Sequence, residues 1–234
     1  MPINTLKPLI FCFFALVAVL ALENWTDVDI YLQNLCYNET RREWLINPIR
    51  HKQLSFIFYD GLKRTLVSFA IACLLNLLLS FKIKQLHPYN HFCLTMLLCF
   101  IIIPCLVAGA KYFTNVYCPY QLNIYNGMYP FVRILEAYPQ DFIQPKIGKC
   151  FPAGHATAGF AFIGLYYAFR QKRWKIFGLI TGLGLGLTAG IYQMLRGQHF
   201  LSHTLFSMFA ALFLAYIVNM LVLQTEKKFP HFFK

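Results

Sequence analysis

The chain has 234 residues, of which 58% are hydrophobic and only 13% are charged, and it carries a formal net charge of +12 at pH 7. About a quarter of the residues in a soluble domain are charged, so this composition excludes an ordinary soluble domain. The apolar residues lie in long blocks and not in amphipathic stripes, which favours a membrane protein.

Six apolar blocks are candidates for membrane-spanning helices. A span needs about 20 apolar residues, at about 1.5 Å rise each, to cross roughly 30 Å of hydrocarbon. Because only helices and closed barrels are stable there, we predict an all-α fold, a polytopic bundle of six transmembrane helices that forms a single domain over residues 1–234. The first block lacks a cleavage site behind it and is interpreted as an uncleaved anchor. The blocks are Leu6–Leu22, Thr65–Phe81, Phe92–Ala110, Ala153–Phe169, Ile176–Met194 and His203–Leu223.

The basic residues predict the orientation of this bundle. On one side, the short connections and the two chain ends hold ten basic residues against a single acid, Glu226. The other side holds eleven basic residues and eight acids, all of them except Arg196 in two long outer segments, about 23–64 and 111–152. Since Lys and Arg in short loops mark the cytoplasmic side, both termini are expected there. The net charge therefore reports topology, and no nucleic-acid partner is needed to explain it.

Two local patterns predict how the elements pack. The first outer segment mixes Trp25, Tyr31 and Trp44 with charged residues, which suits a helix lying on the membrane surface. The stretch "GLGLGL" resembles a nucleotide-binding loop only superficially, because no strand precedes it. Gly182, Gly186 and Gly190 recur every fourth residue, a spacing that predicts close packing between membrane helices.

Three short stretches place unusual polar groups at the outer ends of predicted spans. They read "KYFTNVYCP" (111–119), "CFPAGHATAGF" (150–160) and "RGQHFLSHTLF" (196–206). Ionisable groups at membrane depth are costly, so they are functional candidates by default. All three stretches fall on the same predicted face of the membrane, and we expect them to converge on one site.

These stretches offer the parts of an anion site. Gly154 lets the backbone approach a ligand closely, and the free amides of a helix start attract anions. Lys111 and Arg196 add positive charge, and an arginine can hold phosphate oxygens with two hydrogen bonds. We therefore expect a phosphate to bind here.

The same stretches supply imidazole groups beside this anion site. His155 follows Gly154 directly, and His199 and His203 share a helix face at i and i+4. A positive cradle around imidazoles suits phosphoryl transfer, in which one histidine attacks phosphorus and another protonates the leaving oxygen. The remaining histidines lie in loops and are interpreted as surface residues: His51, His87, His91 and His231.

At these residues the chain resembles the membrane-bound phosphatidic-acid phosphatase type 2 (PAP2) superfamily. "KYFTNVYCP" keeps the family's lysine and proline, "FPAGHA" its Pro-x-Gly-His core, and "GQHFLSH" its Gly-x-His-Phe-x-Ser segment. The resemblance implies that His199 forms a phosphohistidine and that His155 is the general acid. It also implies that Lys111 and the backbone amides at Ala153 and Gly154 hold the phosphate, and that no metal or other cofactor is required.

The chain departs from the family pattern at four positions. Arginine is replaced by Cys118, serine by Ala153 and aspartate by His203, and Gln193 stands at the spacing of a further arginine. Arg196, about one helical turn away, and Arg133 are the candidates to replace the lost arginines. A neutral His203 would fix the tautomer of the nucleophile but stabilise its imidazolium less than a carboxylate, so slower or pH-shifted chemistry is expected.

Two outer cysteines immediately flank the first two motifs. We predict a disulfide between Cys118 and Cys150 that holds the outer loop over the site, with Cys36 left unpaired, if that side of the membrane is oxidising. The other five cysteines lie within predicted spans, where cysteine is an ordinary packing residue.

The sequence thus predicts an integral-membrane lipid phosphatase that acts on a membrane lipid phosphate at the periplasmic face of a bacterial inner membrane. Candidate substrates are lipid A, undecaprenyl pyrophosphate, phosphatidylglycerol phosphate and phosphatidic acid. One alternative is a lipid-to-lipid phosphotransferase, and another is a weakened lipid-phosphate binding or transport protein. A third is a metal site of His155, His199 and His203, which the nearby positive charges of Lys111 and Arg196 disfavour.

Overall fold

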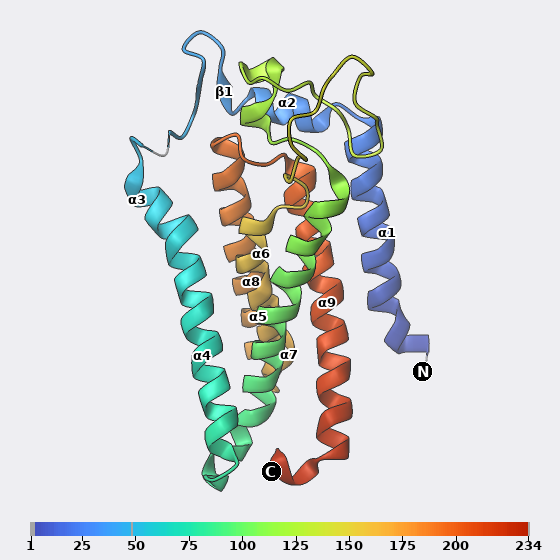
Figure 1. Cartoon of the computed structure of the whole chain (residues 1–234). Coiled ribbons are helices and arrows are strands. Elements are labelled where there is room, and N and C mark those ends of the chain that lie inside the picture. The colour runs from blue at the N-terminus through green and yellow to red at the C-terminus, as the bar shows by residue number, and fades with distance from the viewer. Residues whose placement is uncertain (1–2, 48, 234) are drawn as a thin grey trace.

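Long helices run along a common direction and form the frame of the protein (Figure 1). The computed structural model describes residues 3–47 and 49–233. Within these residues, five helical segments are long and apolar enough to cross a membrane, which indicates a membrane protein. Their helices are α1 (Ile3–Trp25), α4 (Leu62–Ser80), α5 (His87–Thr114), α8 (Lys172–Leu195) and α9 (Leu201–Lys228).

The fourth predicted span differs from the other five. It forms a short helix α6 (Gly154–Phe160), a tighter 3₁₀ segment η5 (Ala161–Gly164) and one further turn, α7 (Leu165–Ala168). Most of this segment is buried, packed against α5, α8 and α9. Surrounding protein shields its backbone, so it needs no continuous apolar exterior. Six spanning helices are therefore not confirmed, and the fourth block is a broken helix in the interior.

The glycines of α8 allow this broken helix to lie close. A Cβ on Gly182 would collide with the backbone of η5 at Ile163, and one on Gly186 would collide with the Phe160 ring of α6. The third glycine of the series, Gly190, faces the side chain of Thr204 on α9. The four-residue spacing thus marks the face of α8 that packs against two neighbours, as the sequence predicts.

The long connections gather at one end of the bundle, which we call the loop end (Figure 1). The first connection contains a short helix, α2 (Val28–Asn34), and an antiparallel pair, β1 (Tyr37–Asn38) and β2 (Glu43–Trp44). It continues through α3 (Lys52–Ser55) and a π-helical turn, η1 (Phe56–Gly61), into α4. A helix thus forms in the segment for which a surface helix is predicted, and this helix, α2, lies across the loop end (Figure 1).

The second long connection, between α5 and α6, packs on the first through an aromatic cluster. It contains two 3₁₀ turns, η3 (Pro119–Gln121) and η4 (Asn123–Tyr125). The Tyr117 and Tyr129 rings stack at a centroid distance of 3.9 Å, and Tyr125 contacts both Tyr37 and Trp44. These contacts join the two outer connections into one layer over the loop end.

The opposite end of the bundle holds two short turns, η2 (Lys84–Leu86) and η6 (Pro230–Phe232), and an ionic cluster. His91 is only 6% exposed, and its Nδ1 lies 3.2 Å from the carboxylate of Glu226, which also pairs with Arg170 at 2.6 Å. The Nε2 of His87 lies 2.9 Å from the Ser80 carbonyl oxygen. The interpretation of His87 and His91 as unpartnered surface residues was therefore wrong, because α5 begins earlier than its apolar block suggests.

The glycine packing predicts a difference between neighbouring positions of α8. Gly186→Ala should lower the free energy of unfolding by about 1–3 kcal/mol, because the new methyl group collides with Phe160. Gly184→Ala is the matched control, because a Cβ there meets no atom within 4 Å, so it should be neutral or stabilise the helix by up to about 1 kcal/mol. Thermal unfolding in detergent measures both, and equal effects of the two changes would contradict this packing.

Candidate active site

The turn between α8 and α9 carries two of the predicted site residues. Gly197 adopts a left-handed backbone with φ +68°, and its N–H bonds to the Met194 carbonyl at 2.9 Å, while the N–H of the next residue bonds to the Gln193 carbonyl at 2.8 Å. This pattern is the Schellman motif, which ends a helix at a glycine. The motif turns the chain abruptly between Arg196 and His199.

The helix α2 holds this turn through two side chains on one of its faces. Gln33 donates a hydrogen bond of 2.9 Å to the Met194 carbonyl at the end of α8. Four residues earlier, the carboxylate of Asp29 accepts hydrogen bonds from the Ser202 N–H, at 2.9 Å, and from the Ser202 hydroxyl, at the start of α9. Helix ends leave such backbone groups unpaired. Burial raises the pKa of Asp29 above its usual range, and its bonds to Ser202 act in the opposite direction.

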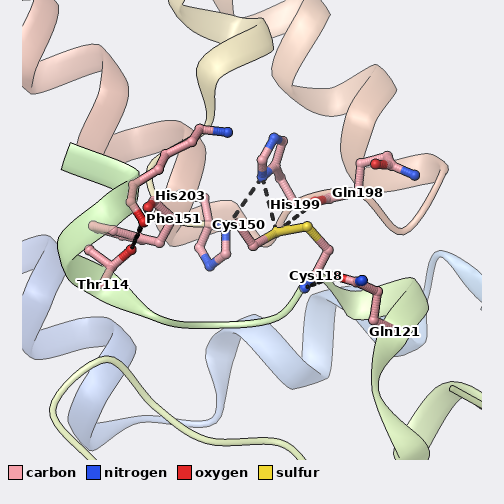
Figure 2. The surroundings of a disulfide bond; sticks show 9 residues. Thr114, Cys118, Gln121, Cys150, Phe151, Gln198, His199 and His203 are labelled. Carbon is pink, nitrogen blue, oxygen red and sulfur yellow. Dashed lines mark hydrogen bonds between the residues drawn. A yellow bond between two sulfur atoms is a disulfide. The ribbon is translucent and has the colours of Figure 1, made fainter. Parts of the chain in front are cut away.

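His199 and His203 face each other through the same ring atom. Their Nδ1 atoms are 3.4 Å apart, and the two residues are only 2% and 1% exposed (Figure 2). The pair can share a hydrogen bond only when one Nδ1 carries a proton and the other does not. His203 therefore stands where it can orient the His199 ring through Nδ1.

The structure contains a disulfide between Cys118 and Cys150, the pairing expected from their places beside the motifs. The sulfur of Cys150 lies 3.4 Å from the Nδ1 of His199 (Figure 2). It also lies 2.9 Å from the Gln198 carbonyl oxygen, a contact without a proton, because a disulfide sulfur carries none. The N–H of Cys150 bonds to the Val116 carbonyl at 3.0 Å. The bridge thus lies directly against the histidine pair.

Lys111 and His155 approach the same place from α5 and α6. The Nζ of Lys111 lies 3.2 Å from where a Cβ on Gly154 would stand, so this glycine leaves room for the ammonium group. The His155 ring is 5.8 Å from the His199 ring, centre to centre. Lys111 and Arg196 are both close enough for their positive charges to repel a proton on the His155 ring. The structure therefore brings together the three predicted histidines and both predicted cations.

Two further residues join this site from the first outer connection. The Tyr59 ring lies over the His155 ring, at a centroid distance of 4.7 Å, and Lys63 is a third cation that acts on His155. They lie in η1 and at the start of α4. No sequence motif marks either residue, and the one signal for Lys63 is its place at the outer end of the predicted span Thr65–Phe81.

Two other residues that the sequence suggests as phosphate ligands have hydrogen-bond partners within the protein. The Ala153 N–H donates to the His203 carbonyl at 3.2 Å, so a phosphate could bind this amide only if that bond broke. Arg133 bonds to the Thr26 carbonyl at 2.8 Å and to Asp27 at 2.6 Å. It therefore fastens the outer loop to the end of α1 and does not replace the lost arginine.

A buried amide occupies the position at which the family pattern has an arginine. Gln193 is fully buried, and neither its side-chain nitrogen nor its side-chain oxygen has a hydrogen-bond partner within the described residues. The guanidinium of Arg196 lies 5.2 Å from the centre of the Tyr192 ring, and its Nε also lacks a partner there. Unpaired buried groups are costly, so both side chains are suited to bind a polar ligand.

The charge state of His199 follows from its surroundings. Burial is the largest influence and lowers the pKa of His199 well below its usual range, and His203, Lys111 and His155 lower it further. A hydrogen bond to the backbone of Cys150 acts in the opposite direction. His199 is therefore neutral near pH 7, with a lone pair on one ring nitrogen.

The structure also bears on the three-histidine metal site. Across residues 3–47 and 49–233, the three potential metal ligands whose donor atoms lie within 4.8 Å of one another are Cys118, Cys150 and His199. His155 and His203 do not belong to this group.

Comparison with known proteins identifies one family. The sequence model of the PAP2 superfamily matches residues 88–227, which include α5 through nearly all of α9. No curated protein and no solved structure matches the chain. The matched region contains Lys111, His155 and His199, whereas α2, Tyr59 and Lys63 lie before it.

The contact between Asp29 and Ser202 predicts a large effect of a residue outside the matched region. Asp29→Ala should lower the free energy of unfolding by about 1–3 kcal/mol, because it leaves the buried N–H and hydroxyl of Ser202 unpaired. Asp141→Ala, at an exposed position of the outer loop, should change it by less than about 0.5 kcal/mol. Denaturant unfolding in detergent measures both, and a neutral Asp29→Ala would disprove the role given to α2.

Proposed function

The chain belongs to the PAP2 superfamily, whose members are generally phosphatases, and from this premise we propose that it removes phosphate from a membrane lipid. It would hydrolyse a phosphate monoester or a pyrophosphate of the lipid headgroup. The observation that carries the proposal is the convergence of His155, His199 and His203 with Lys111 and Arg196.

In the proposed reaction, the Nε2 of His199 attacks phosphorus, because its Nδ1 faces His203 and the disulfide. A bond forms between Nε2 and phosphorus as the bond from phosphorus to the lipid oxygen breaks. His155 in its imidazolium form, which the negative charge of a bound phosphate favours, donates a proton to that oxygen and becomes neutral. Water then attacks the phosphohistidine, His155 takes its proton, and inorganic phosphate leaves.

The surrounding cations would stabilise the charge that develops on the phosphoryl oxygens. Three cations are close enough to His155 to interact with it electrostatically, namely Lys111, Arg196 and Lys63. We assign each of them to bind the phosphate or the rest of the headgroup. The unpaired amide of Gln193 provides a neutral donor. No step requires a metal ion.

An apolar groove supports a lipid substrate. It has a volume of about 150 Å³ and is lined only by apolar side chains of α1, α5 and α9 together with Pro152. Its lining includes Ala110 and Pro152, which are close neighbours in sequence of Lys111 and Gly154. A lipid tail in the groove would therefore leave the headgroup phosphate near the cations. We assign the site to the periplasmic face of a bacterial inner membrane, in line with the basic loops at the opposite end.

The first test is phosphate release from the four candidate lipid phosphates. Purified wild-type protein should release inorganic phosphate from at least one of them, and His199→Ala should reduce the rate at least about 10³-fold. His51→Ala, at an exposed histidine, is the matched control and should retain full activity. Transfer of labelled phosphate to a second lipid would favour the phosphotransferase, and tight binding without turnover would contradict both activities.

The position of His203 predicts a change in pH dependence. Its replacement His203→Asp puts a carboxylate beside His199, which should raise the pKa of His199. A nucleophile must be deprotonated, so the acidic limb of kcat/KM should move to higher pH by about one unit or more. His203→Asn adds no charge and removes only the influence by which His203 lowers the pKa of His199, so it should leave that limb unmoved or raise it by less than His203→Asp does. Identical profiles of the two variants would contradict an electrostatic role for the carboxylate at this position.

A further inference from the structure

The disulfide of Cys118 and Cys150 has a property that the proposed phosphatase reaction does not use. Its two sulfurs and the Nδ1 of His199 form a compact group of three potential metal ligands. Cys118 and Cys150 stand near the two ends of the connection between α5 and α6, and His199 lies in the turn between α8 and α9 (Figure 2). In the disulfide, neither sulfur is a thiolate, the form that binds metal ions strongly.

Reduction would convert both sulfurs into ligands. A dithiol reductant gives two electrons and two protons to the disulfide and becomes a disulfide itself, which leaves thiols on Cys118 and Cys150. Cys150 is fully buried, but Cys118 is partly exposed and lines a surface pocket of about 520 Å³. A reductant can therefore reach the bond from the Cys118 side.

The positions of the ligands fit a zinc ion. With Zn–S near 2.3 Å and Zn–N near 2.0–2.1 Å, a tetrahedral site holds sulfur and nitrogen about 3.6 Å apart and two sulfurs about 3.8 Å apart. The observed distance between the Cys150 sulfur and the His199 Nδ1 is 3.4 Å. Freed of their covalent bond, the two sulfurs separate to about the required spacing. The backbone bond of Cys150 to Val116 holds this segment in place during the change.

The charges favour this ligand set over three histidines. Two thiolates neutralise the charge of a divalent cation, whereas three neutral imidazoles leave it at +2. Lys111 acts electrostatically on His199 and on His155, so a site that stays at +2 would be repelled. Soft thiolates also select zinc over magnesium or calcium.

We propose that, after reduction of the disulfide, Cys118, Cys150 and His199 bind a zinc ion that blocks the active site. Both thiols lose their protons on binding, and water completes the fourth position. A His199 bound through Nδ1 carries its proton on Nε2, so the atom that would attack phosphorus has no lone pair. This last consequence rests on the proposed function, whereas the metal site itself does not.

Metal binding is tested on the full chain in detergent. Protein is reduced with dithiothreitol, freed of it anaerobically, and titrated with Co²⁺ and then Zn²⁺. Reduced wild type should show thiolate-to-cobalt absorption and bind one more equivalent of metal than oxidised wild type.

Cys36→Ser, which removes a buried cysteine outside the cluster, should behave like wild type. Cys118→Ser should lose the extra equivalent, and His199→Ala should bind it at least about tenfold more weakly.

Reduced wild type alkylated with iodoacetamide serves as a second comparison if Cys118→Ser proves unstable. Its polypeptide is unchanged, and loss of the extra equivalent is again expected. Equal metal binding by reduced wild type, alkylated protein and Cys118→Ser would overturn the metal site.

Inhibition is tested separately by phosphate release. Zinc should abolish the activity of reduced wild type, a chelator should restore it, and oxidised protein should be insensitive. Zinc bound without loss of activity would overturn the inhibitory role. Absence of activity in every state would contradict the proposed phosphatase, while the cobalt absorption would still decide whether the metal site exists.

Discussion

The candidate site depends on how the backbone groups at the end of α8 and the start of α9 are paired. A chain that reverses direction between two long helices leaves carbonyls and N–H groups without partners, and burial makes them costly. Gly197 satisfies some through the Schellman motif, and Gln33 and Asp29 of α2 satisfy others with side chains. The turn that carries Arg196 and His199 is therefore stabilised by its own backbone bonds and by two side chains of α2.

Burial of the histidine pair then decides its chemistry. A buried imidazole near several cations loses its proton readily, which makes His199 neutral. An aspartate beside it would favour the protonated form, whereas His203 can only orient the ring through Nδ1. The replacement of the family's aspartate by His203 thus exchanges electrostatic stabilisation of the imidazolium for positioning of the ring, within a site that is already strongly positive.

The frame that brings these groups together is made by close helix packing. The glycine face of α8 lets the broken helix from Gly154 to Ala168 lie inside the bundle, close to α5 and α9. This placement sets His155 and Gly154 beside Lys111. The disulfide and the Val116–Cys150 backbone bond fasten the start of the same segment to the end of α5. The segment that carries Gly154 and His155 is therefore held by α8 along one side and by the end of α5 at its start.

Features that depend on local composition and spacing could be predicted from the sequence. Apolar length predicted five of the helices, the glycine interval predicted the packing face of α8, and motif spacing predicted which histidines and cations would converge. The other features could not be predicted in this way, because they depend on contacts between segments that are distant in the sequence. The fourth apolar block breaks because protein and not lipid surrounds it, and apolar residues look the same in both settings. The first outer connection and the start of α4 contain no motif, yet they contribute Asp29, Gln33, Tyr59 and Lys63 to the site and its support. Arg133 bonds to Asp27 and not to the site. Spacing along the chain carries no information about such pairings, since they arise only when the outer connections fold over the loop end.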